Sequence, residues 1–180
     1  GEGPDSASQS FLAVSFPESE LMIMDYNRIV KDLNGLTESD FMSRVGEIFE
    51  LTAGRLPEPK PRHFEMYIDG AWHTLAARAG SFDPSDPVKG LDVSILQDQL
   101  LSPVLGIEDP RRDVRIGFVG GIRGAEELEK RVNEGFAVAF KLHATSIAEL
   151  LSIADAGEVM PPKSTWFEPK LRDGLVVHQI

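Results

Sequence analysis

The segment FEMYIDGAWHTL, residues 64–75, constrains the fold more than any other part of this 180-residue sequence. Two apolar runs flank Asp69-Gly70, a pair typical of a type I′ hairpin turn, which requires positive φ at both central positions. The predicted register places Tyr67 directly across from Trp72 as a cross-strand aromatic pair. A β-hairpin is therefore expected here.

The same register argues against a metal site on the hairpin. It places His63 and His73 on opposite faces, so these side chains cannot bind one ion there. The sequence has no cysteine, which excludes disulfides, a thiolate nucleophile and zinc–sulfur ligation. We therefore expect no metal site, and we interpret His143 and His178, near the ends of apolar strands, as structural histidines.

Hydrophobic periodicity and capping residues predict the remaining elements. Strands are expected at 11–17, 21–26, 47–52, 113–120, 136–144 and 174–180, the first two forming a hairpin. Helices are expected after an N-cap at Thr37, after a cap at Asp92, at 125–134, and after a capping box of Ser146 and Glu149. Residues 26–35 either extend a strand or begin a short helix.

This order of elements predicts an α+β fold. Hairpins dominate the first half and strands alternate with helices only in the second, so we expect a mixed sheet covered by helices. Residues 1–10, GEGPDSASQS, have the composition of a linker or cleavage scar. We interpret residues 11–180 as a single domain and as the C-terminal part of a larger protein.

The charge balance restricts the partners. Eighteen basic and 29 acidic residues give a net charge of −11, which disfavours nucleic acid and anionic membranes. A local cluster of cations can still bind a small anion, because the average field is screened beyond a short range. No apolar run approaches the roughly 18 residues that span a bilayer. A cytoplasmic location fits this composition.

The segment FVGGIRGAEELE, residues 118–129, is the best candidate for an anion site. A strand leads into glycines and an arginine at the start of a helix: Gly120, Gly121, Arg123 and Gly124. Glycines permit close approach of a ligand, helix N-terminal amides receive anions, and an arginine can clamp phosphate. Neither the dinucleotide nor the Walker pattern is matched. The alternative is a glycine-rich turn whose arginine pairs with Glu126 or Glu127.

A second candidate is the loop MPPKSTWFEPKLRDG, residues 160–174, whose prolines exclude a helix interior. It is not a P-loop, because prolines precede Lys163. Its side chains could still bind an oxyanion, through Lys163, Ser164, Thr165 and Lys170. In the alternative, Trp166 and Phe167 fill the core and the lysines face solvent.

Two weaker candidates complete the set. Arg28 lies near Asp25 and Asp32, and we interpret this segment as a row of solvated charges with Arg28 as a secondary anion candidate. Asp155, close to the proline loop, is the acid that we would consider as a base.

Four stretches together resemble a known family: YNRIVKDLNGL, LDVSILQDQLLSPVLGI, IGFVGGIRG and IADAGEVMPPKSTWFEPKLRDGL. They resemble the bacterial proteins grouped as domain of unknown function 1015, over about residues 11–178. Members are about twice this length, and their upstream half carries a Gly-His-His-Arg segment similar to the ParB and sulfiredoxin-like superfamily, which includes free serine kinases. That segment is absent here, so the resemblance implies a C-terminal half whose missing N-terminal half is a partner.

Two hypotheses follow. In the first, the chain is the phosphate-, nucleotide- or phospho-substrate-binding half of a kinase-like enzyme, inactive alone, whose full-length protein uses ADP or ATP with Mg²⁺. This hypothesis requires Arg123 and Lys163 to converge on one anion. In the second, the chain is a non-catalytic domain that stabilises the parent protein or forms a homo-oligomer.

Overall fold

The computed structural model describes residues 11–15, 17–172 and 174. The chain divides into two compact units, the larger of which spans Ile23–Trp166. The described residues of the smaller unit are 11–15, 17–22, 167–172 and 174. Among the described residues, no helix has the length and apolar character needed to cross a membrane.

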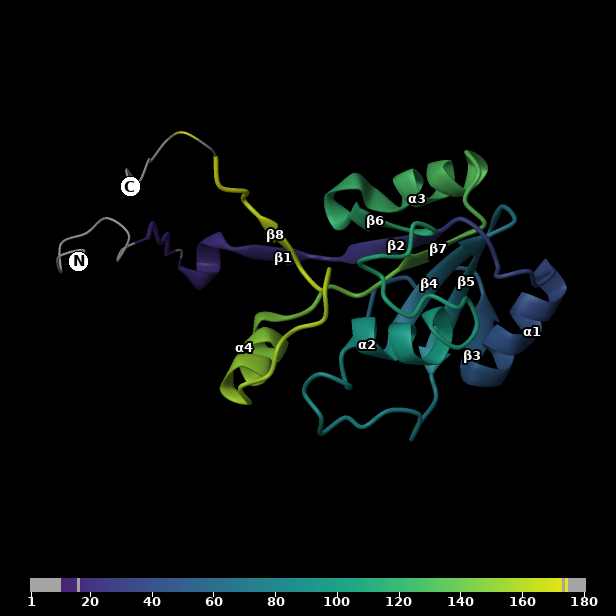
Figure 1. Cartoon of the computed structure of the whole chain (residues 1–180), viewed down its shortest axis with the longest axis horizontal. Coiled ribbons are helices and arrows are strands. Elements are labelled where there is room, and N and C mark those ends of the chain that lie inside the picture. The colour runs from purple at the N-terminus through teal and green to yellow at the C-terminus, as the bar shows by residue number, and fades with distance from the viewer. Residues whose placement is uncertain (1–10, 16, 173, 175–180) are drawn as a thin grey trace, which may run out of the picture. The chain divides into compact units, whose positions relative to one another are not determined.

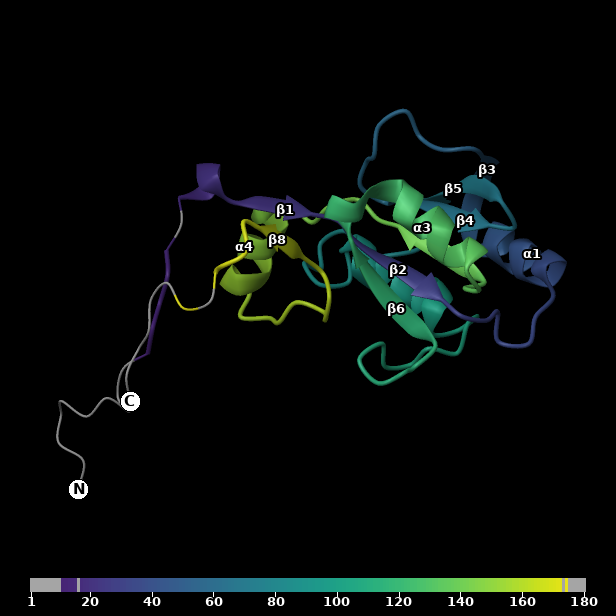
Figure 2. The same ribbon diagram turned by 90° about the horizontal axis from the view of Figure 1, so that it is seen from above.

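A six-stranded sheet forms the larger unit, with the strand order β3-β5-β4-β7-β2-β6. Its strands are β2 (Tyr26–Val30), β3 (Phe49–Ala53), β4 (His63–Ile68), β5 (Ala71–Ala77), β6 (Ile116–Gly120) and β7 (Val138–Lys141). Neighbouring strands run antiparallel, and Figure 2 shows β2 beside β6. Short strands β1 (Met22–Met24) and β8 (Trp166–Glu168) form a second, two-stranded sheet.

Helices cover both faces of the large sheet, as expected, and the α+β class is confirmed (Figure 1). The sheet is antiparallel, however, where a mixed sheet was expected. The helical elements are η2 (Glu18–Glu20), α1 (Glu38–Ile48), α2 (Asp92–Leu96), η3 (Gln97–Leu101), η4 (Gly121–Arg123), α3 (Gly124–Asn133) and α4 (Ile147–Asp155). On one face, Leu128 of α3 packs with Ile29 and Ala139. The larger core on the other face includes residues of α1 and α2, such as Phe41 and Leu96.

The predicted hairpin is confirmed in turn and register. Asp69 and Gly70 have φ values of 46° and 73°, which fit a type I′ turn. Tyr67 lies opposite Trp72, and the centroids of their rings are 5.1 Å apart. The indole Nε1 of Trp72 donates a hydrogen bond of 2.7 Å to Glu129 of α3, so the hairpin also fixes this helix.

The helix caps agree with the sequence except at one residue. Thr37 caps α1 by accepting from the backbone N of Asp40, and Ser146 forms the predicted capping box with Glu149. The predicted cap at Asp92 is wrong, because Leu91 is the N-cap and Asp92 begins α2. The carboxylate of Asp92 instead accepts hydrogen bonds from Arg62.

The two ends of the chain differ from expectation. Residues 11–15 and Pro17 have no regular secondary structure, so the predicted first hairpin is wrong. The ambiguous segment after Tyr26 forms β2 and contains no helix. Gly174 lies in a turn, and the rest of the predicted last strand, with His178, falls outside the described residues.

Candidate anion-binding site

Strand β2 places two side chains of the candidate site on one face of the sheet. Successive side chains of a strand alternate between faces, so Tyr26 and Arg28 share a face. Arg28 lies opposite Phe118 of β6 and opposite Phe140 of β7. Its neighbours in the sheet are therefore aromatic rings.

Arg28 is buried, with only 4% of its surface exposed, so its interpretation as a solvated charge is wrong. Its Nη1 donates a hydrogen bond to the backbone O of Tyr26. Its guanidinium carbon lies 5.6 Å from the centroid of Phe118. Burial lowers the pKa of Arg28 to about 10, although its interaction with Tyr26 acts in the opposite direction. Arg28 therefore remains charged at neutral pH, at a cost in desolvation.

No carboxylate in the described part of the chain forms an ion pair with Arg28. Asp25 is near in sequence, but its Oδ2 accepts a hydrogen bond of 2.7 Å from Asn27 Nδ2. Asn27 is itself buried, and its Oδ1 accepts from the backbone N of Leu142. Asp25 thus helps to fix the opposite face of β2.

The proline loop brings a second cation to this face. Lys163 has a φ of 60° and is exposed. Its Nζ lies 5.6 Å from the ring centroid of Tyr26 and 5.9 Å from that of Phe118. Arg28 and Lys163 therefore approach the same phenylalanine ring.

Two hydrogen bonds of Ser164 hold the loop beside Lys163 in place. Ser164 is buried, and its Oγ donates a hydrogen bond of 2.6 Å to the backbone O of Pro161. Thr145 donates a hydrogen bond of 3.1 Å to the backbone O of Ser164. The Ser164 hydroxyl proton is therefore used within the loop, while Thr165, directly before β8, is half-buried.

At Gly120 and Gly121, the space left by the missing side chains is filled by other side chains of the protein and not by a ligand. A Cβ at Gly120 would lie 2.6 Å from the ring of Trp166, and one at Gly121 would overlap the carboxylate of Asp25. The backbone N of Gly121 donates a hydrogen bond of 2.7 Å to the backbone O of Asp25. This amide is therefore already used. Trp166 also meets Tyr26 edge to face, with their centroids 5.3 Å apart.

The other glycine-loop candidates lie at the start of α3. Arg123 and Gly124 are exposed, and Gly124 has a φ of 71°. The alternative pairing of Arg123 with Glu126 or Glu127 is not found among the described residues, and Glu127 pairs with Arg131 instead, at 2.7 Å. The hydrogen bond from Arg131 is the main cause of the lowered pKa of Glu127, to which Arg123 adds a smaller effect. Convergence of Arg123 and Lys163 stays a prediction.

The two remaining candidates also stay predictions. Asp155 is exposed at the last position of α4. Lys170 is exposed and belongs to the smaller compact unit. Sequence reasoning missed Tyr26 and Phe118, although the position of Tyr26 two residues before Arg28 on a strand indicates a shared face.

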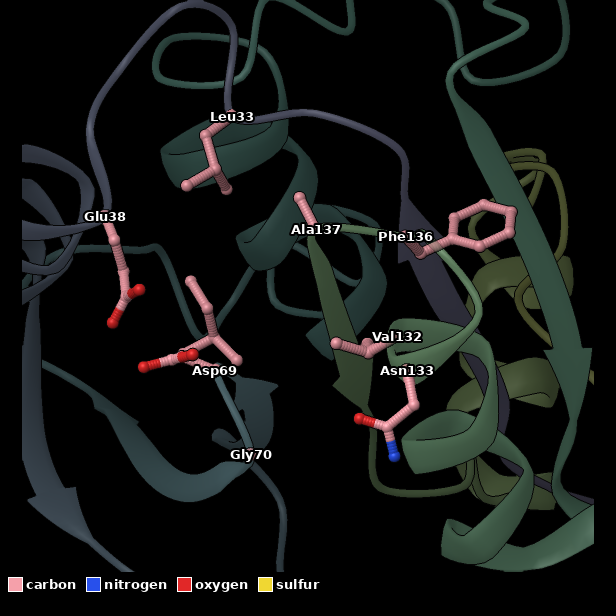
Figure 3. Close-up of a pocket in the computed structure, with 9 residues that line it drawn as sticks. Leu33, Glu38, Asp69, Gly70, Val132, Asn133, Phe136 and Ala137 are labelled. Carbon is pink, nitrogen blue, oxygen red and sulfur yellow. The ribbon is translucent and has the colours of Figure 1, made fainter.

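A cavity of about 360 Å³ lies elsewhere, between the β4–β5 turn and the end of α3 (Figure 3). Its lining includes the carboxylates of Glu38 and Asp69 and the amide of Asn133, with no basic residue among the side chains that line it. Two negative charges make this cavity unsuitable for a phosphate. No group of three histidine or acidic side chains in the described chain is arranged to hold a metal ion.

A family model described as "Protein of unknown function (DUF1015)" matches residues 2–94, just over half of the chain. The matched range ends before the glycine-rich segment and the proline loop. No curated protein matches the sequence.

Several solved structures are similar to this one. A conserved hypothetical protein from Pyrococcus furiosus has 15% identity and a TM-score of 0.52, with 84% of this chain and 57% of that chain covered. Free serine kinase in complex with AMP has 12% identity and a TM-score of 0.48, with 83% of this chain and 55% of that chain covered. A mutant of the kinase in complex with ADP has 16% identity and a TM-score of 0.44, with the same coverage. The Pyrococcus protein shows the fold alone, and the weaker similarities carry no argument about activity. The chain spans just over half the length of these proteins.

Proposed function

Starting from the fact that this chain belongs to the DUF1015 family of proteins of unknown function, we propose that it supplies the anion-binding half of a phosphoryl-transfer enzyme. The ligand is a nucleotide such as ADP or ATP with Mg²⁺, or a phosphorylated substrate. Phosphoryl transfer depends mainly on positioning and on neutralising charge. These are tasks that a domain with well-placed cations performs without a catalytic base of its own.

The observation that carries this proposal is the position of Lys163, exposed and without a carboxylate partner in the described chain. The residue is exposed, its ammonium lies near two aromatic rings, and no ion pair joins it to a carboxylate in the described chain. The loop that holds it is fixed through Ser164. A lysine held in this way is a point charge ready to receive a phosphate.

The proposal also assigns the rest of the site to residues outside this chain. The chain spans 55–57% of the length of the similar solved structures. The family resemblance implies an upstream half with phosphate-handling residues. We therefore place this chain in the C-terminal half of the enzyme and expect no turnover from it alone.

Ligand-induced thermal stabilisation of the full-length protein tests the proposal. A ligand at 100 times its Kd stabilises the folded state by about 2.7 kcal/mol. Each kcal/mol corresponds to about 2–4 °C in Tm for a domain of this size. We expect a shift with ADP, ATP or phosphoserine that Lys163→Ala reduces, whereas Lys60→Ala, at an exposed lysine between β3 and β4, leaves it unchanged.

Arg123→Ala completes the panel and tests convergence with Lys163. If Arg123 contacts the same anion, its loss reduces the shift by a similar amount. The absence of a shift with every ligand would refute the phosphate-binding function. It would support the alternative of a structural domain in which Gly120 and Trp166 simply close the fold.

A further inference from the structure

Arg28 differs from the other arginines that are removed from solvent. Each of the half-buried arginines has a carboxylate partner within 2.6–2.7 Å: Arg62 with Asp92, Arg115 with Asp113 and Arg131 with Glu127. Arg28 is more buried than these three, and no carboxylate of the described chain pairs with it. A buried charge without a counter-charge is strongly unfavourable. This side chain therefore lacks the anion that its environment requires.

Lys163 adds a second positive charge near the unpaired charge of Arg28. The Arg28 guanidinium carbon and the Lys163 ammonium lie 5.6 Å and 5.9 Å from the centroid of the same ring, that of Phe118. The ring attracts both cations, and two cations held at one ring repel each other. An anion that contacts both cations would relieve this repulsion and compensate for the desolvation of Arg28.

We propose that Arg28 and Lys163 together bind one dianionic phosphate monoester group beside the ring of Phe118. This inference rests on the proposed function and deepens it by naming the charge state of the bound group. Two cations without a carboxylate partner favour a group with two negative charges over a carboxylate, a sulfate ester or a phosphodiester, which carry one. The lysine supplies a point charge, and the guanidinium supplies a planar pair of donors.

The exposure of the two cations sets the order in which a ligand meets them. Lys163 is exposed and Tyr26 and Phe118 are half-buried, whereas Arg28 is covered. A phosphate therefore meets the ammonium of Lys163 first. Rotation of the long Arg28 side chain then brings its donors to the phosphate oxygens. The bound phosphate then contacts both the exposed Lys163 and the buried Arg28.

Two matched pairs of probes test the charge state with the full-length protein. Phosphoserine is compared with serine O-sulfate, and AMP with adenosine 5′-sulfate. At pH 7.5 the phosphate monoesters are mostly dianions, since their second pKa is about 6, and the sulfate esters are monoanions of similar shape. In each pair that binds, we expect isothermal titration calorimetry to give a Kd for the phosphate ester at least about tenfold lower than that for the matching sulfate ester.

Variants of Arg28 test whether this residue causes the preference for phosphate over sulfate esters. Arg28→Met removes the charge at similar volume and should abolish the preference for phosphate over sulfate, whereas Arg28→Lys retains part of it. Lys163→Ala should weaken both members of a pair. A folded Arg28→Met protein that keeps the full preference overturns the inference.

Stability gives a second readout that a merely structural arginine would not produce. Without ligand, Arg28→Met should unfold at an unchanged or higher urea concentration, because an uncompensated buried charge is replaced by an apolar side chain. The matched control Arg62→Met should unfold at a lower concentration, since it leaves Asp92 without its partner. A strongly destabilised Arg28→Met protein would contradict the inference.

The outcomes separate the two proposals. If no phosphate probe binds the wild-type protein, the proposed function fails and this inference fails with it. If phosphates bind through Lys163 but Arg28→Met leaves the phosphate-to-sulfate ratio unchanged, only this inference fails.

Discussion

The carboxylate of Asp92 connects the start of α2 to the start of β4. Its Oδ1 accepts hydrogen bonds from the backbone N and from Nη1 of Arg62, at 2.9 Å and 2.6 Å. Burial nevertheless outweighs these bonds and raises the pKa of Asp92 above its usual value. Because the pKa is higher in the folded state than in the unfolded chain, the folded state binds the proton more tightly. Ionisation of Asp92 with rising pH therefore lowers the free energy of unfolding.

We expect Asp92→Asn to lack this pH dependence. The free energy of unfolding of the wild-type protein minus that of the variant should fall as the pH rises from about 4 through the folded pKa. Urea denaturation at a series of pH values measures this difference. Asp109→Asn is a control of opposite sign, because a hydrogen bond from Arg111 lowers the pKa of Asp109 to about 2. A difference for Asp92 that rises with pH would contradict the prediction.

The contact between β6 and the start of β8 depends on a glycine. Gly120 is buried at the end of β6, and Trp166 lies so close that a Cβ would be 2.6 Å from its ring. The edge-to-face contact of Trp166 with Tyr26 fixes the ring from a second side. A side chain larger than hydrogen at position 120 would therefore clash with this ring.

We expect Gly120→Ala to destabilise the fold by about 1–3 kcal/mol, the usual range for an overpacked site. The fluorescence of Trp166 should also change, measured in a Trp72→Phe background because the chain has two tryptophans. Gly46→Ala, in α1 with no neighbour within 4 Å of the added carbon, should leave the fluorescence unchanged. In a double-mutant cycle, Trp166→Ala should relieve part of the cost. Additive effects would contradict the predicted clash.

Elements that depend on local chemistry were predictable from the sequence. The Asp69-Gly70 turn needs only positive φ at two positions, and the cap at Thr37 needs only its neighbours. The strand expected at 11–17 had the right composition, but an apolar run becomes a strand only with a pairing partner. The cap expected at Asp92 failed because its carboxylate binds Arg62, 30 residues earlier in the chain.

At the scale of the whole molecule, the candidate site depends on contacts between distant segments. The chain brings Arg28, Phe118 and Lys163 to one face, and no periodicity in the sequence indicates that arrangement. Burial of Arg28 follows from its place on an interior strand, with β6 on one side and β7 on the other. The net charge of −11 repels a phosphate at long range, so these two cations act only at close contact.

A site completed by residues outside this chain predicts a difference in affinity between the chain and the full-length protein. Lys163 and Arg28 alone supply few contacts, so the isolated chain should bind ADP or phosphoserine at least about tenfold more weakly. Isothermal titration calorimetry on both proteins measures the ratio. Lys163→Ala should reduce the remaining affinity of the isolated chain, whereas Lys60→Ala should not. This result would show that Lys163 contacts the ligand from within the 180-residue chain that both proteins contain. Equal affinities would contradict the composite site, because they would mean that all ligand contacts lie within these 180 residues.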